Sequence, residues 1–473
     1  MNRFLLAKVQ LDEIAREKGA RHIADAMQNL SQSPSAAYNK LMHRIDQMGP
    51  ASRSTAFRLL SFVLYARRPL KMDEIISALD PEVDGDTGGD NHASEQLKSD
   101  EIIQLGQGFL IQVHQNLAAI VRFVHSTALS FLKEYASHCQ GSLVFQDTIS
   151  ELVLGNACLQ YLGTIPEFAM ATADMKGEVE KRYKKYRFSK YASAYWAAHI
   201  KGAGEDMSQI REAFYMAFSP DGLRHSIEQL TEGISFQIGS PLIHILAESG
   251  LETLCRIELS KPYFSIPSNY LLIKRNASFI VLKKNRWGRL PLEIAASKGH
   301  AGIVELLIEK SGLEVSAQSA LIYAAQGGHL QAARSILRGR GESDSSNLGE
   351  WEALKSAISR GYLGMVKLLL ESGTLDLNKT DTVGNTLFHL AAEGGNKNVV
   401  QALLDAGADV SRENGDGDSA LHLAADWGSI DVVEVLVNAK ADVSNKNKAG
   451  MSARDVAARS NYRQITAIMD RSL

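Results

Sequence analysis

Cysteine is scarce in this sequence, and long hydrophobic runs are missing. Its three cysteines, Cys139, Cys158 and Cys255, lie far apart and form no Cys-x-x-Cys or Cys/His cluster. This spacing argues against a disulfide framework or a structural zinc site and favours a reducing compartment. No stretch approaches the ~18 consecutive apolar residues of a membrane span, and the apolar segment 4–7 is too short for a signal peptide. We therefore expect a cytoplasmic location, with the nucleus left open, and no membrane contact.

An excess of either charge is also missing. The 473 residues contain 51 Lys and Arg against 54 Asp and Glu, a formal net charge of -3. Such a chain has no overall field to attract phosphate backbones, so nucleic acid is an unlikely partner. The hydrophobic content of 45% is ordinary for a globular protein, and the length predicts two to four modules rather than one core.

Motifs of catalysis and nucleotide binding are absent as well. The sequence has no His-Glu-x-x-His, no Gly-x-Ser-x-Gly, and no Gly-Lys dipeptide. A P-loop needs Gly-Lys followed by Ser or Thr, because backbone amides surround the phosphates while the Lys reaches the terminal ones. We expect no enzyme activity, no cofactor, no metal and no small-molecule substrate.

A repeat is the strongest positive feature. Gly384, Gly417 and Gly450 are spaced by 33 residues, and they open the related segments GNTLFHLAAEGG, GDSALHLAADWG and GMSARDVAARSN. Apolar residues largely follow the small residues of the repeat at offsets of 8, 9, 12 and 13, which form one helical face. The same spacing continues upstream from six small residues in all: Ala295, Ala324, Ala357, Ala391, Ala424 and Ala457. A weaker seventh unit centres on Leu246.

The repeats resemble ankyrin repeats, through TLFHLA at 386–391 and SALHLA at 419–424, against the family pattern Thr-Pro-Leu-His-x-Ala. The hydroxyl of Thr386 or Ser419 is expected to cap the first helix of a unit, the Ala pair to allow close helix approach, and a Gly to turn the chain into the second helix. Because His389 and His422 recur with the repeat, we expect them to form hydrogen bonds between neighbouring loops rather than to bind metal. The last unit should be a solvated cap.

The first half predicts a helix-turn-helix and a hairpin. Residues 57–79 have helical apolar spacing on both sides of Pro69. Two short apolar runs, GFLIQVH and AIVRFVH, then flank residues 115–118, and an amphipathic segment begins near Ser126, which is placed to be its N-cap. Leu129, Phe131 and Leu132 should pack beneath it. This order is the outline of a winged helix.

These segments, together with YASAYWAAHI and the opening FLLAKVQLDEI, resemble the helical parts that follow the nucleotide-binding core in fungal NACHT proteins, which often carry ankyrin repeats. The resemblance implies a receptor-type architecture in self/non-self recognition. The sequence departs from that family because it has no P-loop. The resemblance also implies a nucleotide contact for His125; without a core, a packed structural role is the better expectation.

Two segments are biased in charge. Residues 80–101 contain eight acidic residues and one Lys, and we expect a solvated linker there, since an EF-hand would place Asn91 where a bidentate Glu is needed. Residues 176–190 contain seven basic and two acidic residues. That run could bind an anionic ligand, but an exposed helix face is the commoner explanation.

Ankyrin-type arrays bind partners through loop tips and exposed positions of the first helices. In the register of this repeat, those positions predict a hollow face with alternating charge and with two Trp anchors. The candidate partner-binding residues are Arg286, Trp287, Arg289, Lys298, Asn385, Glu393, Glu413, Asp416, Asp418, Asp426, Trp427, Lys446, Lys448 and Arg459. The alternative is that Trp287 covers its neighbouring repeat and that the charges are merely solvated.

The expected fold is mainly α, with a winged-helix and helical N-terminal half followed by an ankyrin-repeat solenoid. The predicted segments are helical residues 1–56, a winged-helix-like domain 57–140 with the acidic loop 80–101, a helical region 141–235, and six to seven repeats in 236–473. The predicted function is non-catalytic binding of another protein, as a scaffold or regulator. The alternatives are the sensor half of a NACHT-type switch ATPase, and a transcriptional regulator or accessory protein of a fungal pathway such as secondary metabolism.

Overall fold

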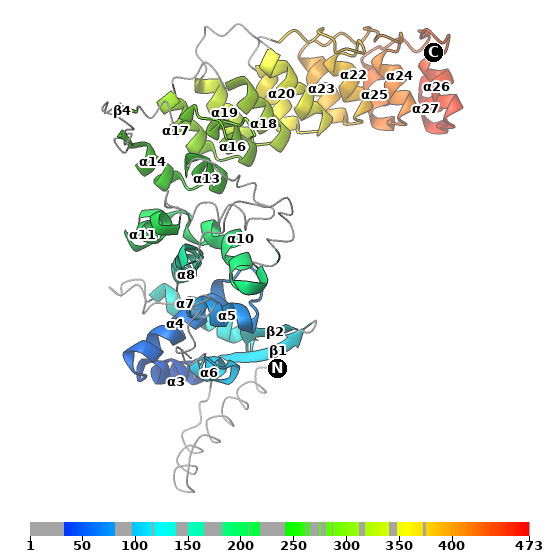
Figure 1. The fold of residues 1–473 in the computed structure, drawn as a ribbon. Coiled ribbons are helices and arrows are strands. Elements are labelled where there is room, and N and C mark those ends of the chain that lie inside the picture. Colours follow the sequence, from blue (N-terminus) through cyan, green and yellow to red (C-terminus); the bar gives the residue numbers. More distant parts are fainter. Residues whose placement is uncertain are drawn as a thin grey trace. The chain divides into compact units, whose positions relative to one another are not determined.

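The computed structural model is mainly helical and divides into two compact units, Met1–Ser240 and Pro241–Leu473 (Figure 1). The residues that it describes are 33–80, 97–115, 118–138, 150–164, 180, 183–206, 208–217, 242–260, 263–264, 274–275, 281–285, 287–311, 317–339, 348–371 and 375–472.

The N-terminal unit consists of helices and one antiparallel hairpin. Its elements are α3 (Pro34–Asp46), α4 (Pro50–Tyr65), α5 (Met72–Leu79), α6 (Ser99–Leu105), β1 (Leu110–Gln115), β2 (Ala118–Phe123), α7 (Ser126–His138), α8 (Glu151–Thr164), α10 (Ser189–Ile200), the 3-10 helix η3 (Ala203–Asp206) and α11 (Ser208–Ala217).

The predicted helix-turn-helix and hairpin are both present. The chain leaves α4 at Tyr65 and enters α5 at Met72, with Pro69 between them, where its missing N–H interrupts no helix. Helix α4 runs through position 56, where the expected first segment ended, because residues 50–65 form one continuous helix. Strands β1 and β2 pair from Leu110 opposite Phe123 to Gln115 opposite Ala118.

A short third strand segment joins this hairpin. Lys71, just before α5, forms an isolated antiparallel bridge with Ile120 of β2, and the Val121 N–H donates to the Leu70 carbonyl at 3.2 Å. The described part of residues 50–138 thus contains three helices, a hairpin and a further helix, with a strand contact before the second helix. The name winged helix remains a prediction for this region.

Two details differ from the sequence-based expectation. Ser126 is the first residue of α7 rather than its cap; the cap is His125, whose Nδ1 accepts a hydrogen bond from the Thr127 N–H at 3.2 Å. The last residues of the acidic segment 80–101 are helical rather than part of a linker, because α6 begins at Ser99. Glu101 Oε2 caps this helix by accepting a hydrogen bond from the Lys98 N–H at 2.8 Å. Residues 81–96 lie outside the described residues.

The core of the N-terminal unit is aromatic. Helices α8, α10 and α11 pack together around Trp196, Tyr191 and Phe214, all fully buried. Phe188 stacks on Tyr191 with ring centroids 5.4 Å apart. A second aromatic group fixes α7, since Phe131 lies 5.3 Å from Tyr38 and Leu132 is fully buried, as the amphipathic spacing of α7 predicts.

The C-terminal unit is a row of helix pairs. The described residues contain seven pairs: α13 (Leu242–Ser249) and α14 (Glu252–Ser260), α16 (Pro291–Lys298) and α17 (Ala301–Ser311), α18 (Ala317–Gly327) and α19 (Leu330–Gly339), α20 (Leu348–Ser359) and α21 (Leu363–Glu371), α22 (Leu387–Glu393) and α23 (Lys397–Asp405), α24 (Ala420–Asp426) and α25 (Ile430–Asn438), and α26 (Ala453–Arg459) and α27 (Arg463–Asp470). The two-residue strands β3 (Tyr263–Phe264) and β4 (Lys274–Arg275) pair between α14 and α16.

Each pair packs on the next, first helix against first helix and second against second (Figure 1). The predicted spacing explains why, because the small residues Ala391 and Ala424 and the apolar residues that follow them, such as Val399 and Val432, are buried. A small side chain lets two first helices approach closely, while the apolar face of each second helix is covered by the neighbouring units. The solenoid prediction is confirmed for this unit.

Glycine is required at the turn between the helices of a unit. Gly395 and Gly428 both have φ +69°, in the left-handed region that L residues rarely adopt. A Cβ on Gly428 would lie 2.7 Å from the Tyr462 ring of the next unit. The predicted turn function of these glycines is confirmed, and their small size also allows contact between units.

Candidate functional site

The loops between units are built on one recurring polar side chain. In the loop before α24, Asn414 Oδ1 accepts hydrogen bonds from the backbone N–H groups of Asp416 and Asp418, both at 2.9 Å. Asp381 and Asn447 do the same in the loops before α22 and α26. An Asx side chain that satisfies two amides fixes the turn without help from a partner. The loop tips are therefore rigidly presented.

The recurring histidines join one loop to the next. His389 Nδ1 accepts from the Thr386 N–H at 3.2 Å, and its Nε2–H donates to the Asp418 carbonyl at 3.0 Å. His422 makes the corresponding bonds to the Ser419 N–H at 3.2 Å and the Met451 carbonyl at 3.1 Å. Burial lowers the pKa of His389, and the hydrogen bond to Asp418 opposes this only in part. The predicted hydrogen-bonding role of these histidines is confirmed.

Several predicted partner-binding side chains are also used within the array. Asn414 Nδ2 donates to Asn385 Oδ1 at 2.9 Å, and Asn447 Nδ2 donates to Asp418 Oδ1 at 2.7 Å. Glu413 Oε1 accepts from Asn445 at 2.8 Å. Their side chains thus hold neighbouring loops together, so a substitution there would disturb the array as well as any contact with a partner.

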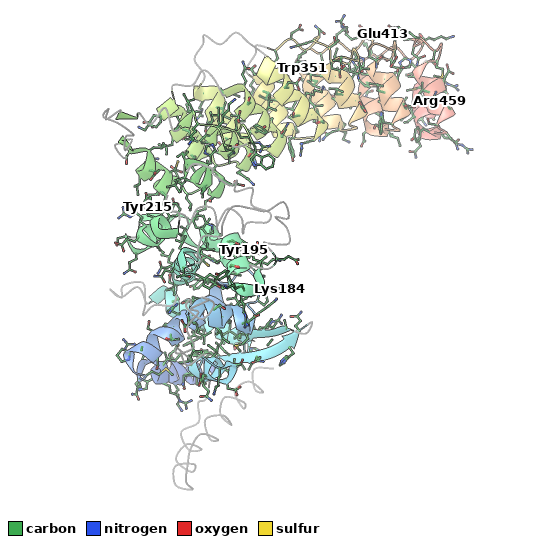
Figure 2. All side chains as sticks on the ribbon, in the orientation of Figure 1. Lys184, Tyr195, Tyr215, Trp351, Glu413 and Arg459 are labelled. Atoms are coloured by element: carbon green, nitrogen blue, oxygen red, sulfur yellow. The ribbon has the colours of Figure 1, made fainter. Side chains whose placement is uncertain are left out.

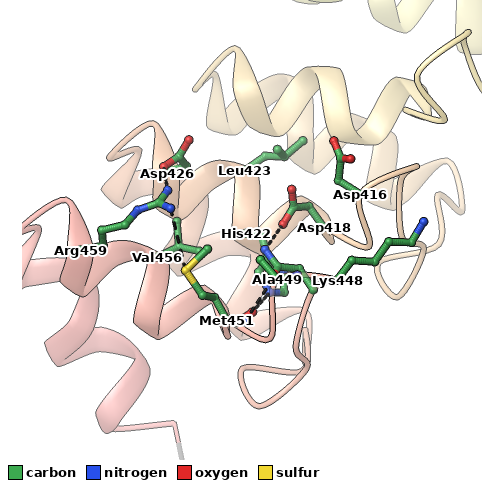
Figure 3. A pocket seen from close by; sticks show the side chains of 11 residues that line it. Asp416, Asp418, His422, Leu423, Asp426, Lys448, Ala449, Met451, Val456 and Arg459 are labelled. Carbon is green, nitrogen blue, oxygen red and sulfur yellow. Dashed lines mark hydrogen bonds and ion pairs between the residues drawn. The ribbon is translucent and has the colours of Figure 1, made fainter.

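A hollow of about 500 Å³ opens on this face between the units of α24–α25 and α26–α27 (Figure 3). It brings together five of the candidate partner-binding residues with six that are not among those candidates. The predicted ones are Asp416, Asp418, Asp426, Lys448 and Arg459, and the others are His422, Leu423, Asn447, Ala449, Met451 and Val456. The register of the repeat contained the signal for two of the second group, since Ala449 and Met451 occupy the positions equivalent to Asp416 and Asp418 of the preceding unit.

The two ends of the hollow are polar and its middle is apolar. In Figure 3, the Arg459–Asp426 ion pair lies at one end, with Nη2 and Oδ1 3.2 Å apart, and Asp416 and Lys448 lie at the other. Lys448 Nζ donates to the Gly415 carbonyl at 2.6 Å. Leu423 lies between the two ends. This arrangement can hold an apolar group and distinguish the charge of its neighbours.

Comparison with known proteins agrees with the repeat geometry. A family model for ankyrin repeats matches in three overlapping copies, at residues 315–381, 354–447 and 388–468. Residues 315–468 are ankyrin repeats. The pairs α13–α14 and α16–α17 lie before the matched residues but continue the same helix-on-helix packing.

Two curated relatives match part of the chain. The Ankyrin repeat and KH domain-containing protein mask-1 of Caenorhabditis elegans is 34% identical over 142 residues, which are 30% of this chain and 5% of that protein. The Probable E3 ubiquitin-protein ligase XBOS33 of Oryza sativa subsp. japonica is 30% identical over 167 residues, 26% of this chain and 32% of that protein. The chain spans less than a third of the length of either relative. The family model matches nothing before residue 315, so the NACHT resemblance stays a prediction.

The predicted tryptophans are both at the surface. The exposed fractions of Trp427 and Trp287 are 60% and 66%. Trp427 directly follows Asp426 of the hollow, at the end of α24. Both side chains are therefore accessible at the surface, and their role in binding a partner stays a prediction.

Two cations of the basic patch around Trp287 contact other side chains of the same unit of the fold. The Arg289 guanidinium lies 4.8 Å from the Tyr323 ring centroid, and Lys298 Nζ lies 3.3 Å from Glu248 Oε1. Arg286 lies outside the described residues. Of the remaining predicted residues, Glu393 is half-buried on α22 and Lys446 is exposed. The structure does not bring this patch together with the hollow of α24–α27, which is formed by other repeats.

His125 and the basic run have local contacts in the N-terminal unit. Besides capping α7, His125 Nδ1 lies 3.0 Å from Thr127 Oγ1, which in turn lies 3.0 Å from the Tyr38 hydroxyl. This agrees with the structural role expected for His125. In the basic run, Lys190 Nζ lies 5.3 Å from the Tyr183 ring centroid; residues 176–179, 181 and 182 lie outside the described residues.

The N-terminal unit contains a partly buried polar network that no sequence motif indicates. The Tyr191 hydroxyl donates to His199 Nε2 at 2.9 Å, and His199 Nδ1–H donates to Glu151 Oε1 at 3.0 Å. Arg67 donates from Nη2 to Glu151 at 2.6 Å and from its backbone N–H to the Tyr191 oxygen at 3.0 Å. Burial lowers the pKa of His199 and raises the pKa of Tyr191. The network joins the loop after α4 to α8 and α10.

Within the described part of the chain, no helix is both long and apolar enough to cross a bilayer. Among those same residues, no three metal-binding side chains come close enough together to hold an ion.

Proposed function

We propose that this chain is a non-catalytic interaction protein whose ankyrin repeats bind another protein at the hollow between α24–α25 and α26–α27. The hollow itself is the observation that supports this most directly, because it combines a mixed charged and apolar lining with the exposed Trp427 beside it. Stacked repeats commonly present such surfaces to partners. A scaffold or regulatory role follows if the N-terminal unit contacts something else.

A non-catalytic role is also supported by how the polar groups are used. His389 and His422, the strongest candidates for acid-base chemistry in the array, have both ring nitrogens engaged in hydrogen bonds to the array itself. The rice relative is named a probable ubiquitin ligase, but the match covers only 32% of that protein. We propose that the shared feature is the repeat array and not a ligase activity.

Affinity capture with matched variants tests the proposal. The binding variant combines Asp416→Lys with Trp427→Ala; Asp418 is left intact because it holds Asn447 in place. Each anchor of this kind is worth roughly 2 kcal/mol on truncation, so the captured protein should be lost almost completely. The control is Glu434→Lys, an exposed charge reversal on the second helix α25.

Circular dichroism and thermal melting of each variant should match those of the unaltered protein. Capture of the same proteins in the same amounts by the Asp416→Lys, Trp427→Ala variant would reject this site as the binding surface.

A second candidate function is that of the regulatory half of a NACHT-type switch ATPase. The order of α4, α5, α6 and the hairpin, together with the Lys71–Ile120 bridge, favours it because a winged helix has this order. The sequence has no P-loop of its own. Genomic sequence upstream of Met1 provides the test: an in-frame P-loop would support this function, and a promoter region with no such reading frame would argue against it.

A further inference from the structure

The hollow is lined by three carboxylates and two cations, and among the described residues two of those carboxylates have no ion-pair partner. Lys448 Nζ is bonded to the Gly415 carbonyl at 2.6 Å, and Arg459 is paired with Asp426 at 3.2 Å. Asp418 accepts a hydrogen bond only from the neutral amide of Asn447. Among the described residues, no cation lies within ion-pair distance of Asp416 or Asp418.

The unbalanced charge of the hollow is therefore negative and is concentrated at one end. An anionic ligand at this end would meet two carboxylates, those of Asp416 and Asp418, against the single cation of Lys448, and like charges at close range cost several kcal/mol. A cationic group would be attracted, and its attraction would be strengthened by the partial exclusion of water from a concave surface.

The apolar side chains extend from this acidic end to the other end of the hollow, where the Met451 sulfur lies 3.8 Å from Arg459 Nη1 (Figure 3). Leu423 and Val456 come from the first helices α24 and α26, and Met451 comes from the loop before α26 (Figure 3). Leu423 and Met451 are only half-buried. A flexible thioether next to a branched side chain adapts to apolar groups of different shape.

We propose that the hollow binds an extended protein segment in which an Arg or Lys is followed within one or two positions by a large apolar residue. The cation lies between Asp416 and Asp418, and the apolar side chain lies on Leu423, Met451 and Val456. A volume of about 500 Å³ accommodates a few side chains rather than a folded domain. This inference rests on the proposed function and specifies the chemistry of the partner.

The carboxylate of Asp416 can be replaced without removing the hydrogen bonds that hold its loop. Its backbone makes the loop contacts, with the N–H bonded to Asn414 Oδ1 and the carbonyl accepting from the Lys448 N–H, while its side chain is exposed. Replacing that side chain should change the charge of the hollow and leave the loop intact. Glu434→Lys again serves as the control for a change in net charge.

Selection from a phage-displayed library of random decapeptides on the full-length chain tests the partner chemistry. We expect enriched sequences to share an Arg or Lys close before Leu, Ile, Met or Phe. The consensus peptide, labelled with a fluorophore, is then titrated by fluorescence anisotropy. Its affinity should fall about tenfold in Asp416→Asn and further in Asp416→Lys, stay within about twofold of the unaltered chain in Glu434→Lys, and weaken as salt is raised.

Substitutions in the peptide separate the two parts of the site. Replacing the basic residue by Gln should abolish the difference between the unaltered chain and Asp416→Asn. Replacing the apolar residue by Ser should weaken binding equally to both proteins.

Enrichment of acidic peptides, recovery of no peptide at all, or equal loss of affinity in Asp416→Lys and Glu434→Lys would each overturn the inference. So would binding of a labelled single-stranded oligonucleotide that competes with the peptide. These outcomes leave the proposed function standing if the protein captured by the chain is still lost in Trp427→Ala. If neither Asp416→Lys nor Trp427→Ala reduces capture of that protein, the proposed function fails as well.

Discussion

Replacing His389 by Leu should destabilise the array locally and strongly. His389 is fully buried, and its ring joins the Thr386 N–H to the Asp418 carbonyl. Leucine has a similar size but makes neither bond. The Thr386 N–H then has no partner in a buried position, whereas the Asp418 carbonyl still accepts from the Asn414 N–H at 2.9 Å.

The expected loss can be estimated from these two groups. An unpaired buried donor costs about 1–3 kcal/mol, and an ordinary lost hydrogen bond about 1 kcal/mol. The sum is roughly 2–4 kcal/mol. Because local opening controls amide exchange in native proteins, this corresponds to exchange that is roughly 30- to 1,000-fold faster. The acceleration should be confined to α22, α24 and the loop between their units.

Hydrogen exchange followed by mass spectrometry on the full-length chain measures this directly. Peptides from α8 and α10 of the N-terminal unit act as an internal control and should exchange as before. Unchanged protection in residues 386–426 of His389→Leu would show that the loop-to-loop hydrogen bonds contribute little to stability, which would refute the reasoning.

Three further predictions concern the pH dependence of His389, the turn at Gly428 and the hydroxyl of Tyr191. Burial lowers the pKa of His389 below 6.5, so the unfolded chain binds the additional proton first as the pH falls. The free energy of unfolding should therefore have its full value above about pH 6.5 and decline below it. In His389→Leu, the slope of this free energy against pH should be smaller. Gly428→Ala should lower the stability of the array by roughly 1–2 kcal/mol in urea titrations, because Gly428 has φ +69° and a Cβ would meet the Tyr462 ring. An unaltered midpoint would contradict that. Tyr191→Phe removes the hydroxyl that joins Arg67 to His199 and should cost the N-terminal unit roughly 1–3 kcal/mol by calorimetry, with the array unaffected.

The repeat was predictable because its signals are local. The 33-residue spacing of Gly417 and its equivalents fixed the register, and the recurrence of His389 at His422 indicated a hydrogen bond repeated in every unit. Burial of the Ala and Val positions then follows from the helical spacing alone. Five of the residues that line the hollow were found in the same way.

The remaining features depend on contacts between distant residues. Arg67 and Glu151 are separated by 84 positions and His199 and Glu151 by 48, and no pattern in one sequence relates them. The dual use of Asp418 was missed for a similar reason, because its carboxylate partner is Asn447 in the next unit. The prediction of Ser126 as the N-cap of α7 was wrong because the His125 side chain, one position earlier, accepts the hydrogen bond from the Thr127 N–H at the start of the helix.

Asp418 both links neighbouring loops and lines the hollow. Its carbonyl holds the histidine of the preceding unit, its carboxylate holds the asparagine of the following one, and it also lines the hollow. The side chains of Asp416 and Leu423 can therefore change without loss of a hydrogen bond between loops, whereas a change of the Asp418 side chain also breaks its bond to Asn447 of the next unit. Divergence among descendants of this gene should accumulate around that aspartate and spare it.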